Sequence, residues 1–542
     1  MAPRSPRRRK ISPKWRWIFA FIVASLVALI ICVWLAIKRA EPILRARVIE
    51  TLSTRFKSKV ELAEFHVWLD KGLHAEGKGL KIFGPTDPNP SLPGVQPLLQ
   101  IDTFRFGSSV RSLFHQPMRL DTIFVDGLTM NIPPKKDRQE VKNLRRRGGR
   151  MSIAVSHFIC TNTKLVINTD KPGKLPLIFD ISQLKMNDIG PSKPLQFQAT
   201  LMNPKPVGEI YASGLFGPLN ELSPSDSLVA GSYFFTNADL STLKGIGGIL
   251  SSSGKYAGTL SRIEVQGQTD TPDFRLAVSG HRVPLHTDFH AIVDGTDGDT
   301  YLDPVKAKVL NSTFTASGKV VKVATPPGHD IQLEVMLDDA LIQDLLKLGV
   351  KTDPPVMSGR VKMRSSLSIS PGPRDISDRL KLAGQFQIPN ARFSNEKLQT
   401  KIDALSLRSS GQPKLVRDAA QLVVPSNIQG EFSLKDGILS FPSLRFQVPG
   451  TNALMSGRYS LDGRTFDFHG NLRLEAKLSQ MTTGWKSLLL KPVDPFFHKH
   501  GAGTELPFKI TGTKSAPHFG LDFGHKDSDP TPADSSDQAD SR

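Results

Sequence analysis

The sequence has few of the residues on which disulfide-stapled domains and metal sites depend. Its 542 residues include two cysteines, Cys32 in a long apolar run and Cys160 in an expected strand. This excludes a disulfide framework and a cysteine metal site. Tyrosine and tryptophan are also scarce, at five each against 30 phenylalanines. Because phenylalanine has no polar group, this balance favours an extended apolar surface over a sugar-binding cleft.

Catalytic motifs are missing as well. The sequence has no nucleophile elbow, kinase set, Walker loop or zinc-protease motif. The best candidate is the stretch HTDFH, in which His286, Asp288 and His290 share one face of an expected strand and could hold zinc. The same spacing fits the wet face of an amphipathic strand, with Leu285 and Phe289 opposite, and we favour this interpretation. We therefore expect no enzyme, no metal and no cofactor; an anchored hydrolase or glycan-binding enzyme would depend on this trio.

Acidic residues are sparse in three short stretches that hold most of the net charge of +19. Residues 1–16 carry seven Arg and Lys and no acid, residues 38–59 seven against two, and residues 135–150 eight against two. A nucleic-acid groove would need cations along the fold itself, so we expect no nucleic-acid partner. The third stretch is either a solvated loop or a contact for anionic lipid headgroups. The candidates for that contact are Arg145, Arg146, Arg147 and Arg150.

One long hydrophobic run stands out, WIFAFIVASLVALIICVWLAI at residues 17–37. It is uncharged and long enough to cross a bilayer as a helix, and Trp17 and Trp34 lie near its ends, where interface anchors occur. Its apolar core is too long for a cleaved signal peptide, so we predict an uncleaved anchor. The basic residues before it predict a cytoplasmic N-terminus. The rest of the chain would then lie in the periplasm of a diderm bacterium, attached to the inner membrane by a single pass.

Strand patterns dominate after this run. Residues 38–59 first predict an amphipathic helix, which we expect to pack on the first strands rather than lie at the membrane surface. From about residue 60 to 523, apolar and polar residues alternate, as in DFHGNLRLEAKLS at 467–479. Such alternation predicts strands with one apolar and one wet face. Short helices are expected at 239–252, 338–349 and 479–497, and the polar tail at 524–542 predicts disorder.

Asp-Gly pairs and recurring glycines indicate how the strands are joined and bent. Asp-Gly pairs predict two-residue hairpin turns between antiparallel neighbours; they occur at 126–127, 294–295, 297–298, 436–437 and 462–463. A looser repeat places a glycine inside strand patterns, where it marks a bulge or a bend. Its members are Gly214, Gly280, Gly318, Gly359, Gly384, Gly457, Gly470 and Gly512. This pattern predicts an antiparallel sheet that keeps bending the same way.

The order of these landmarks resembles the AsmA-like family of diderm bacteria. The apolar run followed by RARVIETLSTRFKSKVELAEFHVWL is similar to the start of that family, and RLDTIFVDGLTMNIPP is similar to its next strand–Asp-Gly–strand unit. Three segments resemble its C-terminal region, namely LAGQFQIPNARFSNEKLQTKIDALS, LRLEAKLSQMTTGWKSLLLKPVDPFF and LPFKITGTKSAPHFGLDF. The resemblance implies a repeating β-groove, like those of TamB, YhdP and chorein-type bridge proteins implicated in moving phospholipids between membranes. It carries no catalytic residues.

We therefore predict a mainly β protein, with one long antiparallel sheet curled into an open groove, preceded by a transmembrane helix and interrupted by a few short helices. The expected divisions are a basic cytoplasmic segment (1–16), the membrane helix (17–37), a connecting helix (38–59), an N-terminal and central groove (60–380), a C-terminal β region (381–523) and a tail (524–542).

An apolar strand face must be covered by a second sheet, by a barrel wall or by lipid. We expect phospholipid acyl chains to cover it, in support of lipid transfer and outer-membrane biogenesis. The alternative is a scaffold that assists outer-membrane protein assembly without carrying lipid. Expected partners are phospholipids, the inner membrane, and envelope-assembly proteins or a second copy. The candidate lipid-facing residues are Leu472, Leu474, Ala476, Leu478, Phe466, Phe468, Leu444, Phe446 and Val448.

Overall fold

The structure is a computed structural model of the chain. It describes residues 25, 42, 45–46, 48–50, 52–53, 58–69, 72–84, 96–108, 118–132, 153–168, 172–190, 193–218, 223–351, 353–416, 424–460, 465–482, 503–513 and 516–522. The predicted membrane helix lies outside these ranges except for Ser25, and so do the basic segments 1–16 and 135–150. Within the described part of the chain, no helix is long and apolar enough to cross a membrane.

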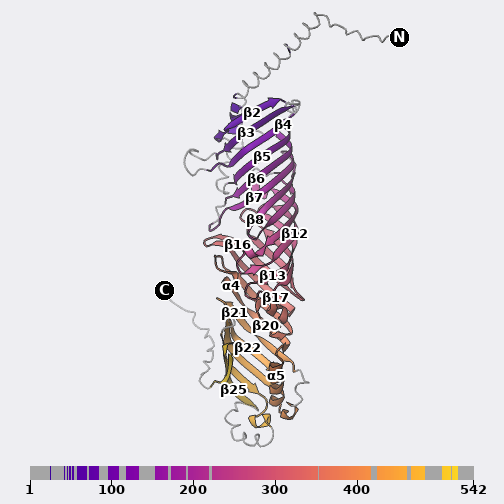
Figure 1. The fold of residues 1–542 in the computed structure, drawn as a ribbon, viewed down its shortest axis with the longest axis vertical. Coiled ribbons are helices and arrows are strands. Elements are labelled where there is room, and N and C mark those ends of the chain that lie inside the picture. The colour runs from indigo at the N-terminus through magenta and orange to yellow at the C-terminus, as the bar shows by residue number, and fades with distance from the viewer. Residues whose placement is uncertain are drawn as a thin grey trace, which may run out of the picture.

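About two thirds of the described residues lie in strands, in one long curled sheet that runs from the indigo N-terminal end to the yellow C-terminal end (Figure 1). This confirms a mainly β fold with an open, curled sheet and few helices. The strands of the first half are β1 (Val60–Glu61), β2 (Glu64–Leu69), β3 (Leu73–Ile82), β4 (Leu99–Ser108), β5 (Met118–Ile132), β6 (Ile153–Ile167), β7 (Leu177–Ile189), β8 (Leu195–Pro204), β9 (Val207–Phe216), β10 (Leu228–Asp239), β11 (Ile246–Gly247), β12 (Ile249–Thr259) and β13 (Arg262–Leu276).

The second half continues the same sheet without a break at residue 381. Its strands are β14 (Val283–Val293), β15 (Thr300–Val309), β16 (Ser312–Ala324), β17 (Pro327–Leu341), β18 (Met357–Ser358), β19 (Arg360–Ile369), β20 (Leu380–Phe393), β21 (Ser426–Lys435), β22 (Ile438–Val448), β23 (Thr451–Ser460), β24 (Phe466–Leu474), β25 (Thr504–Thr513) and β26 (Ala516–Leu521). The labelled helices are η2 (Pro224–Asp226), η3 (Leu240–Thr242), α3 (Ile342–Gly349), α4 (Ile376–Arg379), α5 (Glu396–Ser409) and η5 (Leu478–Met481).

One step of the sheet is parallel. Strand β5 pairs with β6 in parallel, with Met118 opposite Ile153 and Ile132 opposite Ile167, whereas the other described pairs are antiparallel. The expectation of a wholly antiparallel sheet is therefore wrong at this step. A parallel pair needs a connection of a dozen residues or more, and residues 133–152 supply that length.

Antiparallel pairing after β6 places the strand connections alternately on two rims of the groove. We call the rim that holds the β6–β7 connection the first rim; it also carries η3, α3, α5 and η5. The opposite, second rim begins with the β7–β8 connection and carries η2 and α4. Figure 1 shows α4 and α5 on opposite sides of the sheet.

Glycines on one face allow the sheet to curl sharply. A Cβ atom on Gly214 would lie 2.1 Å from the carbonyl oxygen of Ala230, and one on Gly457 would lie 2.4 Å from that of Asp467. No side chain fits such a gap, so the neighbouring backbones approach closely only because glycine is present. The β9–β10 ladder keeps its register at Gly214 and the β23–β24 ladder does so at Gly457, whereas the β22–β23 ladder shifts its register beside Gly457. We call the residues of this kind the crease glycines: Gly214, Gly231, Gly254, Gly267, Gly318, Gly384, Gly430, Gly457 and Gly470.

Register shifts interrupt many of the ladders, and three of them lie near the first-rim ends of β10, β17 and β20. Each of these three precedes an alanine with no exposed surface, namely Ala238, Ala340 and Ala391. After the first two, a short helix starts, and its first N–H donates to a glycine carbonyl, Leu240 to Gly248 and Ile342 to Gly359, at 2.9 Å in both cases. This internal repeat was not predicted.

The described residues between 42 and 53 are helical. Val48, Ile49 and Leu52 pack on a core cluster of the first strands, which contains Val60, Leu62, Phe65, Ala75, Leu80 and Ile82. The side chain of Arg45 donates to the carbonyl oxygen of Leu62 at 3.2 Å. Packing of this segment on the first strands is therefore confirmed.

Local predictions had mixed outcomes. The helix expected at 338–349 is present as α3, but the one at 239–252 is reduced to η3, because glycines follow it and the chain returns to strand. At 479–497, η5 ends at Met481 and residues 483–497 lie outside the described residues. Helix α5 was missed, although Asn395 caps it by accepting from the N–H of Leu398 at 3.1 Å.

The hairpin turns predicted at the Asp-Gly pairs also had different outcomes. Asp436 and Gly437 form a two-residue turn with φ of 52° and 73° between β21 and β22, as predicted. The pairs at 294–295 and 297–298 share one longer connection, between β14 and β15. The pair at 126–127 lies inside β5, so the turn expected there is wrong. The pair at 462–463 lies outside the described residues.

Candidate functional site: the apolar lining of the groove

Directly opposed residues of neighbouring strands lie on the same face of a sheet, so the ladder register assigns the faces. On one face, Phe446 of β22 opposes Ala453 of β23, which opposes Leu472 of β24, which opposes Leu506 of β25. The residues between them, such as Arg445 and Arg473, point to the other face and are exposed. We call the apolar face the lining and the polar face the outer face.

Seven of the nine predicted lipid-facing residues lie on this lining. Four belong to β24 and three to β22, and their alternation matches the predicted strand pattern: Phe466, Phe468, Leu472, Leu474, Leu444, Phe446 and Val448. The structure thus places these seven residues on one apolar strand face, and their contact with lipid stays a prediction.

The other two predicted residues do not belong to a strand, because β24 ends at Leu474. The N–H of Ala476 donates to the carbonyl oxygen of Ser409, the last residue of α5, at 2.8 Å, and Ala476 is buried beside that helix. Leu478 begins η5. The strand expected over 467–479 is therefore too long, because contacts with α5 draw the chain out of the ladder.

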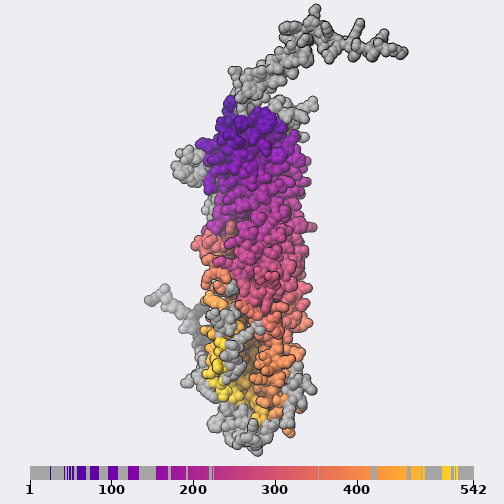
Figure 2. All heavy atoms as spheres, viewed as in Figure 1, coloured from indigo at the N-terminus to yellow at the C-terminus, as the bar shows by residue number. Residues whose placement is uncertain are grey.

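The lining is only half covered. Phe441, Phe446, Phe468 and Leu472 are half-buried, although each is a large apolar side chain. The substantial contacts of the described strands are with their ladder neighbours or with a helix at a rim, so these strands form a single layer. Figure 2 shows the surface hollowed between the orange and yellow strands at this end.

Burial increases toward the first rim. Leu474 and Val448, the last lining residues of their strands, are 4 % and 6 % exposed. Ile428 and Ile388 are also buried, in a cluster that Leu444 and Phe446 touch from the groove side. The predicted set therefore contains two kinds of residue. Those near the first rim are buried by packing, and the others are half-buried; we call the half-buried part of the lining, which includes Phe441, Phe468 and Leu472, the floor.

A cluster of phenylalanines covers the floor between β20 and β24. The rings of Phe386 and Phe441 lie 6.3 Å apart and those of Phe441 and Phe468 lie 6.0 Å apart, although an intervening strand separates each pair. Gly457 stands between the last two, and a Cβ atom there would lie 2.4 Å from the ring of Phe468. Only Phe466, Phe468 and Phe446 of the wider set were predicted. The missed strands show the same signal, an alternation around glycine in LAGQFQI and GEFSL.

The lining of the middle section, β8–β14, mixes apolar side chains, among them Phe197 opposite Gly214, with hydroxyl groups. Tyr233 and Ser252 place their hydroxyl oxygens 3.1 Å apart, and those of Thr269 and Thr287 are 2.6 Å apart. Burial raises the pKa of Tyr256 to about 12. The middle lining thus adds paired hydroxyl groups to an apolar surface.

The HTDFH trio lies on the outer face, while Leu285 and Phe289 lie on the lining, as the favoured interpretation required. His286 Nδ1 is 2.6 Å from Asp270 Oδ1 and its Nε2 is 3.5 Å from Asp288 Oδ2. The hydrogen bond to Asp270 is the main reason that the pKa of His286 is raised. Within the described ranges, no group of three or more His, Cys, Asp or Glu side chains could hold a metal ion.

The outer face also has a hollow of about 520 Å³, over β19–β22. Charged and amide side chains line it, among them Lys362, Arg364 and Glu431. Leu337, Met363 and Phe386 also line it, but polar groups predominate, so it suits an acyl chain less well than the lining does.

The predicted anchor residues Trp17 and Trp34 and the predicted membrane contacts Arg145, Arg146, Arg147 and Arg150 lie outside the described residues. In comparisons with protein-family models, curated proteins and solved structures, no match to this chain was found. The fold and the lining therefore carry the functional proposal by themselves.

Proposed function

We propose that the chain binds phospholipid acyl chains along its lining and supports lipid transfer in the biogenesis of an outer membrane. In this proposal, residues 17–37 anchor it in the inner membrane of a diderm bacterium, with a cytoplasmic N-terminus and a periplasmic groove. The observation that carries the proposal is the half-exposed apolar floor, represented by Phe441, Phe468 and Leu472. No enzymatic activity is part of it.

Removing apolar groups from water is favourable by about 0.8 kcal/mol per CH₂. An acyl chain on this floor would gain that free energy at each methylene, and the floor would lose its own contact with water. Acyl chains are fluid and need no shaped pocket, only a continuous apolar path. Because successive positions along the lining offer similar burial, we expect a bound lipid to slide at small cost.

The length of the sheet sets the reach of such a path. Because β1, β11 and β18 pair with the same strands as β2, β12 and β19, they add no length, so the other 23 described strands set the reach. With a spacing of about 4.8 Å, the groove extends on the order of 105 Å at most. The resemblance to AsmA-like proteins agrees with this architecture, and we propose membership of that family on the resemblance alone.

The test is to purify the full chain in mild detergent and measure co-purifying phospholipid by mass spectrometry, before and after one substitution. We expect wild-type protein to carry phospholipid and Leu472→Asp to carry several-fold less while remaining folded. Ser456→Asp is the matched control, because Ser456 is an exposed outer-face residue of the adjacent strand β23. Wild-type protein that is folded and free of lipid would overturn the proposal.

One observation favours the alternative, a scaffold for outer-membrane protein assembly that carries no lipid. On the outer face, Tyr211 and Phe234 oppose each other and are 42 % and 57 % exposed. A photo-crosslinking residue at Phe234 that captures assembly proteins, together with no lipid crosslink at Phe441, would support the scaffold over the lipid groove.

A further inference from the structure

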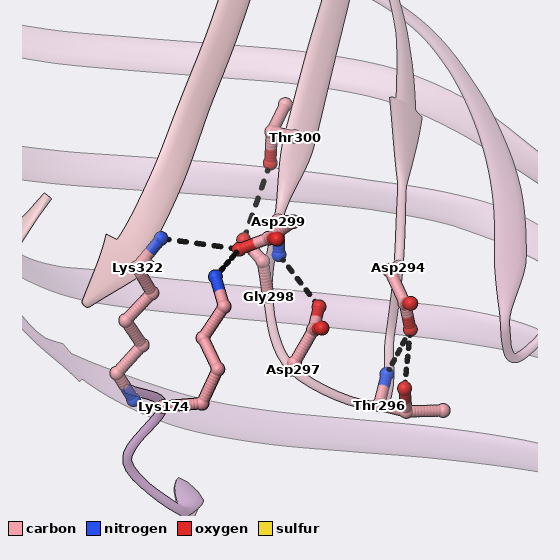
Figure 3. A network of polar contacts seen from close by, with 8 residues as sticks. All are labelled: Lys174, Asp294, Thr296, Asp297, Gly298, Asp299, Thr300 and Lys322. Atoms are coloured by element: carbon pink, nitrogen blue, oxygen red, sulfur yellow. Dashed lines mark hydrogen bonds and ion pairs between the residues drawn. The ribbon is translucent and has the colours of Figure 1, made fainter. Parts of the chain in front are cut away.

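The two rims of the groove meet at a point far apart in sequence. The β6–β7 connection, on the first rim, contacts the β14–β15 connection and the end of β16, both on the second rim (Figure 3). Lys174 Nζ and Asp299 Oδ1 are 2.5 Å apart, and both side chains are shielded, at 11 % and 13 % exposed. We call this contact the clasp.

Two further hydrogen bonds cross between the rims beside the ion pair. Lys322 Nζ donates to the carbonyl oxygen of Pro176 at 3.0 Å, and the N–H of Ala324 donates to that of Gly173 at 2.7 Å. Because water is largely excluded, an ion pair here is stronger than an exposed one, and removal of either charge leaves the other buried without its partner.

The acidic side of the clasp is held in position by its own rim. The N–H of Lys322 donates to Asp299 Oδ1 at 3.1 Å, and the N–H of Asp299 donates to Asp297 Oδ1 at 3.0 Å. Asp294 closes the same connection by accepting from the N–H of Thr296 at 2.8 Å. Asp299 is therefore oriented toward the first rim before Lys174 reaches it.

A second crossing supports this geometry. The η3–β11 segment of the first rim reaches α4 on the second rim, where Lys244 Nζ donates to the carbonyl oxygen of Pro373 at 3.0 Å. The N–H of Ile376 donates back to the carbonyl oxygen of Lys244 at 3.1 Å. Contact between rims thus recurs along the groove; among the residues that the structure describes, the clasp is the crossing with a shielded ion pair, and the second crossing is held by hydrogen bonds.

A lipid whose tails lie on the lining must project its headgroup through the opening between the rims. Each crossing contact closes that opening at its own place, so a headgroup passes the clasp, and likewise the second crossing at Lys244, only while that contact is open. We propose that the Lys174–Asp299 clasp regulates movement of lipid along the groove, stopping it when closed and releasing it when open. This inference rests on the proposed function of the lining.

The clasp can open without unfolding the sheet. Its partners lie in the β6–β7 and β14–β15 connections and at the end of β16, and the described strands contribute no ladder hydrogen bond between the two rims. Opening therefore breaks only the crossing contacts, which is the condition for a local two-state element.

The experiment locks the clasp with a covalent crosslink. It uses the full chain carrying Cys32→Ser, so that this thiol cannot react with the crosslinker. Cys160 is fully buried and is kept. Lys174→Cys and Asp299→Cys are joined with a thiol-cleavable bismaleimide. Photo-crosslinking residues at Ile123 of β5 and Phe441 of β22, on either side of the clasp, report lipid as covalent adducts. We expect adducts at both positions in unlocked protein, a several-fold loss on one side after locking, and recovery after cleavage of the linker.

The matched control locks two points of the same rim. His281→Cys and Lys347→Cys replace residues that already touch within the first rim, where His281 Nδ1 is 2.9 Å from the carbonyl oxygen of Lys347. This lock crosses no opening and should leave both adducts unchanged. Adducts that persist equally on both sides of a locked clasp would overturn the regulatory role while sustaining the groove. Absence of adducts at both positions in unlocked protein would overturn the proposed function, and the clasp proposal with it.

Discussion

The middle section (β8–β14) and the C-terminal section (β19–β25) use the same ladder but different linings. Both bend at crease glycines, and in both an aromatic ring lies over the glycine of the next strand, Tyr233 over Gly254 and Phe468 over Gly457. Beyond these rings, the lining of the middle section mixes hydroxyl groups with apolar side chains such as Phe197 and Phe289, whereas phenylalanines cluster on the C-terminal lining. The comparison shows that two different features are involved. The close approach of backbones at the glycines curls the sheet, whereas the side chains of the lining form the surface that a ligand would contact.

We therefore expect substitution of a crease glycine to be equally destabilising in both sections. These substitutions should cause the largest loss of unfolding free energy among the variants considered. We expect Gly457→Val and Gly254→Val each to cost about 4 kcal/mol or more, because the new side chain meets backbone atoms that cannot move aside. At Gly254, a Cβ atom would lie 2.5 Å from the carbonyl oxygen of Gln266. Chemical denaturation followed by circular dichroism measures the change.

Gly190→Ala is the control for the crease, because nothing lies within 4 Å of a Cβ atom there. We expect its unfolding free energy to change by no more than about 0.5 kcal/mol. If Gly254→Val were as mild as this control while Gly457→Val unfolded the chain, the two sections would not share one folding device.

The second prediction divides the C-terminal section itself. Leu474 is 4 % exposed and packs near the first rim, whereas Leu472 is half-buried on the open floor. We expect Leu474→Asp to cost about 3 kcal/mol or more, since it buries a carboxylate, and Leu472→Asp to cost about 1 kcal/mol. Equal losses of stability, measured by denaturant unfolding, would show that the floor is covered like a core.

The alternation of residues made the strands and the lining of β22 and β24 predictable, because a strand with one apolar face has period two in any surroundings. The end of β24 was not predictable in this way. Ala476 and Leu478 continue the alternation, yet Ala476 is drawn to the carbonyl oxygen of Ser409, a residue far away in sequence. Local pattern identifies a face; tertiary contacts decide where that face stops.

The parallel β5–β6 step and the clasp were missed for a related reason. Both strands of the parallel pair alternate normally, so nothing local distinguishes a parallel from an antiparallel neighbour. Lys174 and Asp299 lie in polar turns whose sequences predict only solvated loops. Their meeting depends on how far the sheet curls, which is a sum over many strands rather than a property of either turn.

The hydroxyl groups of the middle section give a smaller effect. Tyr233→Phe removes one hydroxyl contact, to Ser252, and leaves the ring over Gly254. We expect a loss of about 1 kcal/mol in unfolding free energy, measured by urea titration. Tyr233→Leu should cost more, because it also uncovers the crease glycine. If the two variants were equally stable, the ring would not contribute to the crease.

The smallest expected effect is the dependence of stability on pH. It can be compared between His469 of the C-terminal section and His286 of the middle section. Both have a pKa raised above 6.5, for His469 mainly by its hydrogen bond to Asp522 and for His286 mainly by that to Asp270. A raised pKa means that folding favours the protonated ring. The stabilisation is therefore complete below about pH 6.5 and is lost as the pH rises through the raised value.

Between the two, His469 should respond more strongly. Its partner Asp522 is 11 % exposed and lies 2.6 Å away, whereas Asp270 is 53 % exposed and solvent weakens its pairing with His286. The loss of stability is measured as the difference between the urea midpoints at about pH 5.5 and about pH 8.5, which lie on either side of the pH range in which histidines titrate. We expect His469→Gln to remove more of the pH dependence than His286→Gln does. If the urea midpoint of His469→Gln decreases between these two pH values as much as that of the wild type does, the His469–Asp522 pair adds nothing to the stability of the C-terminal section.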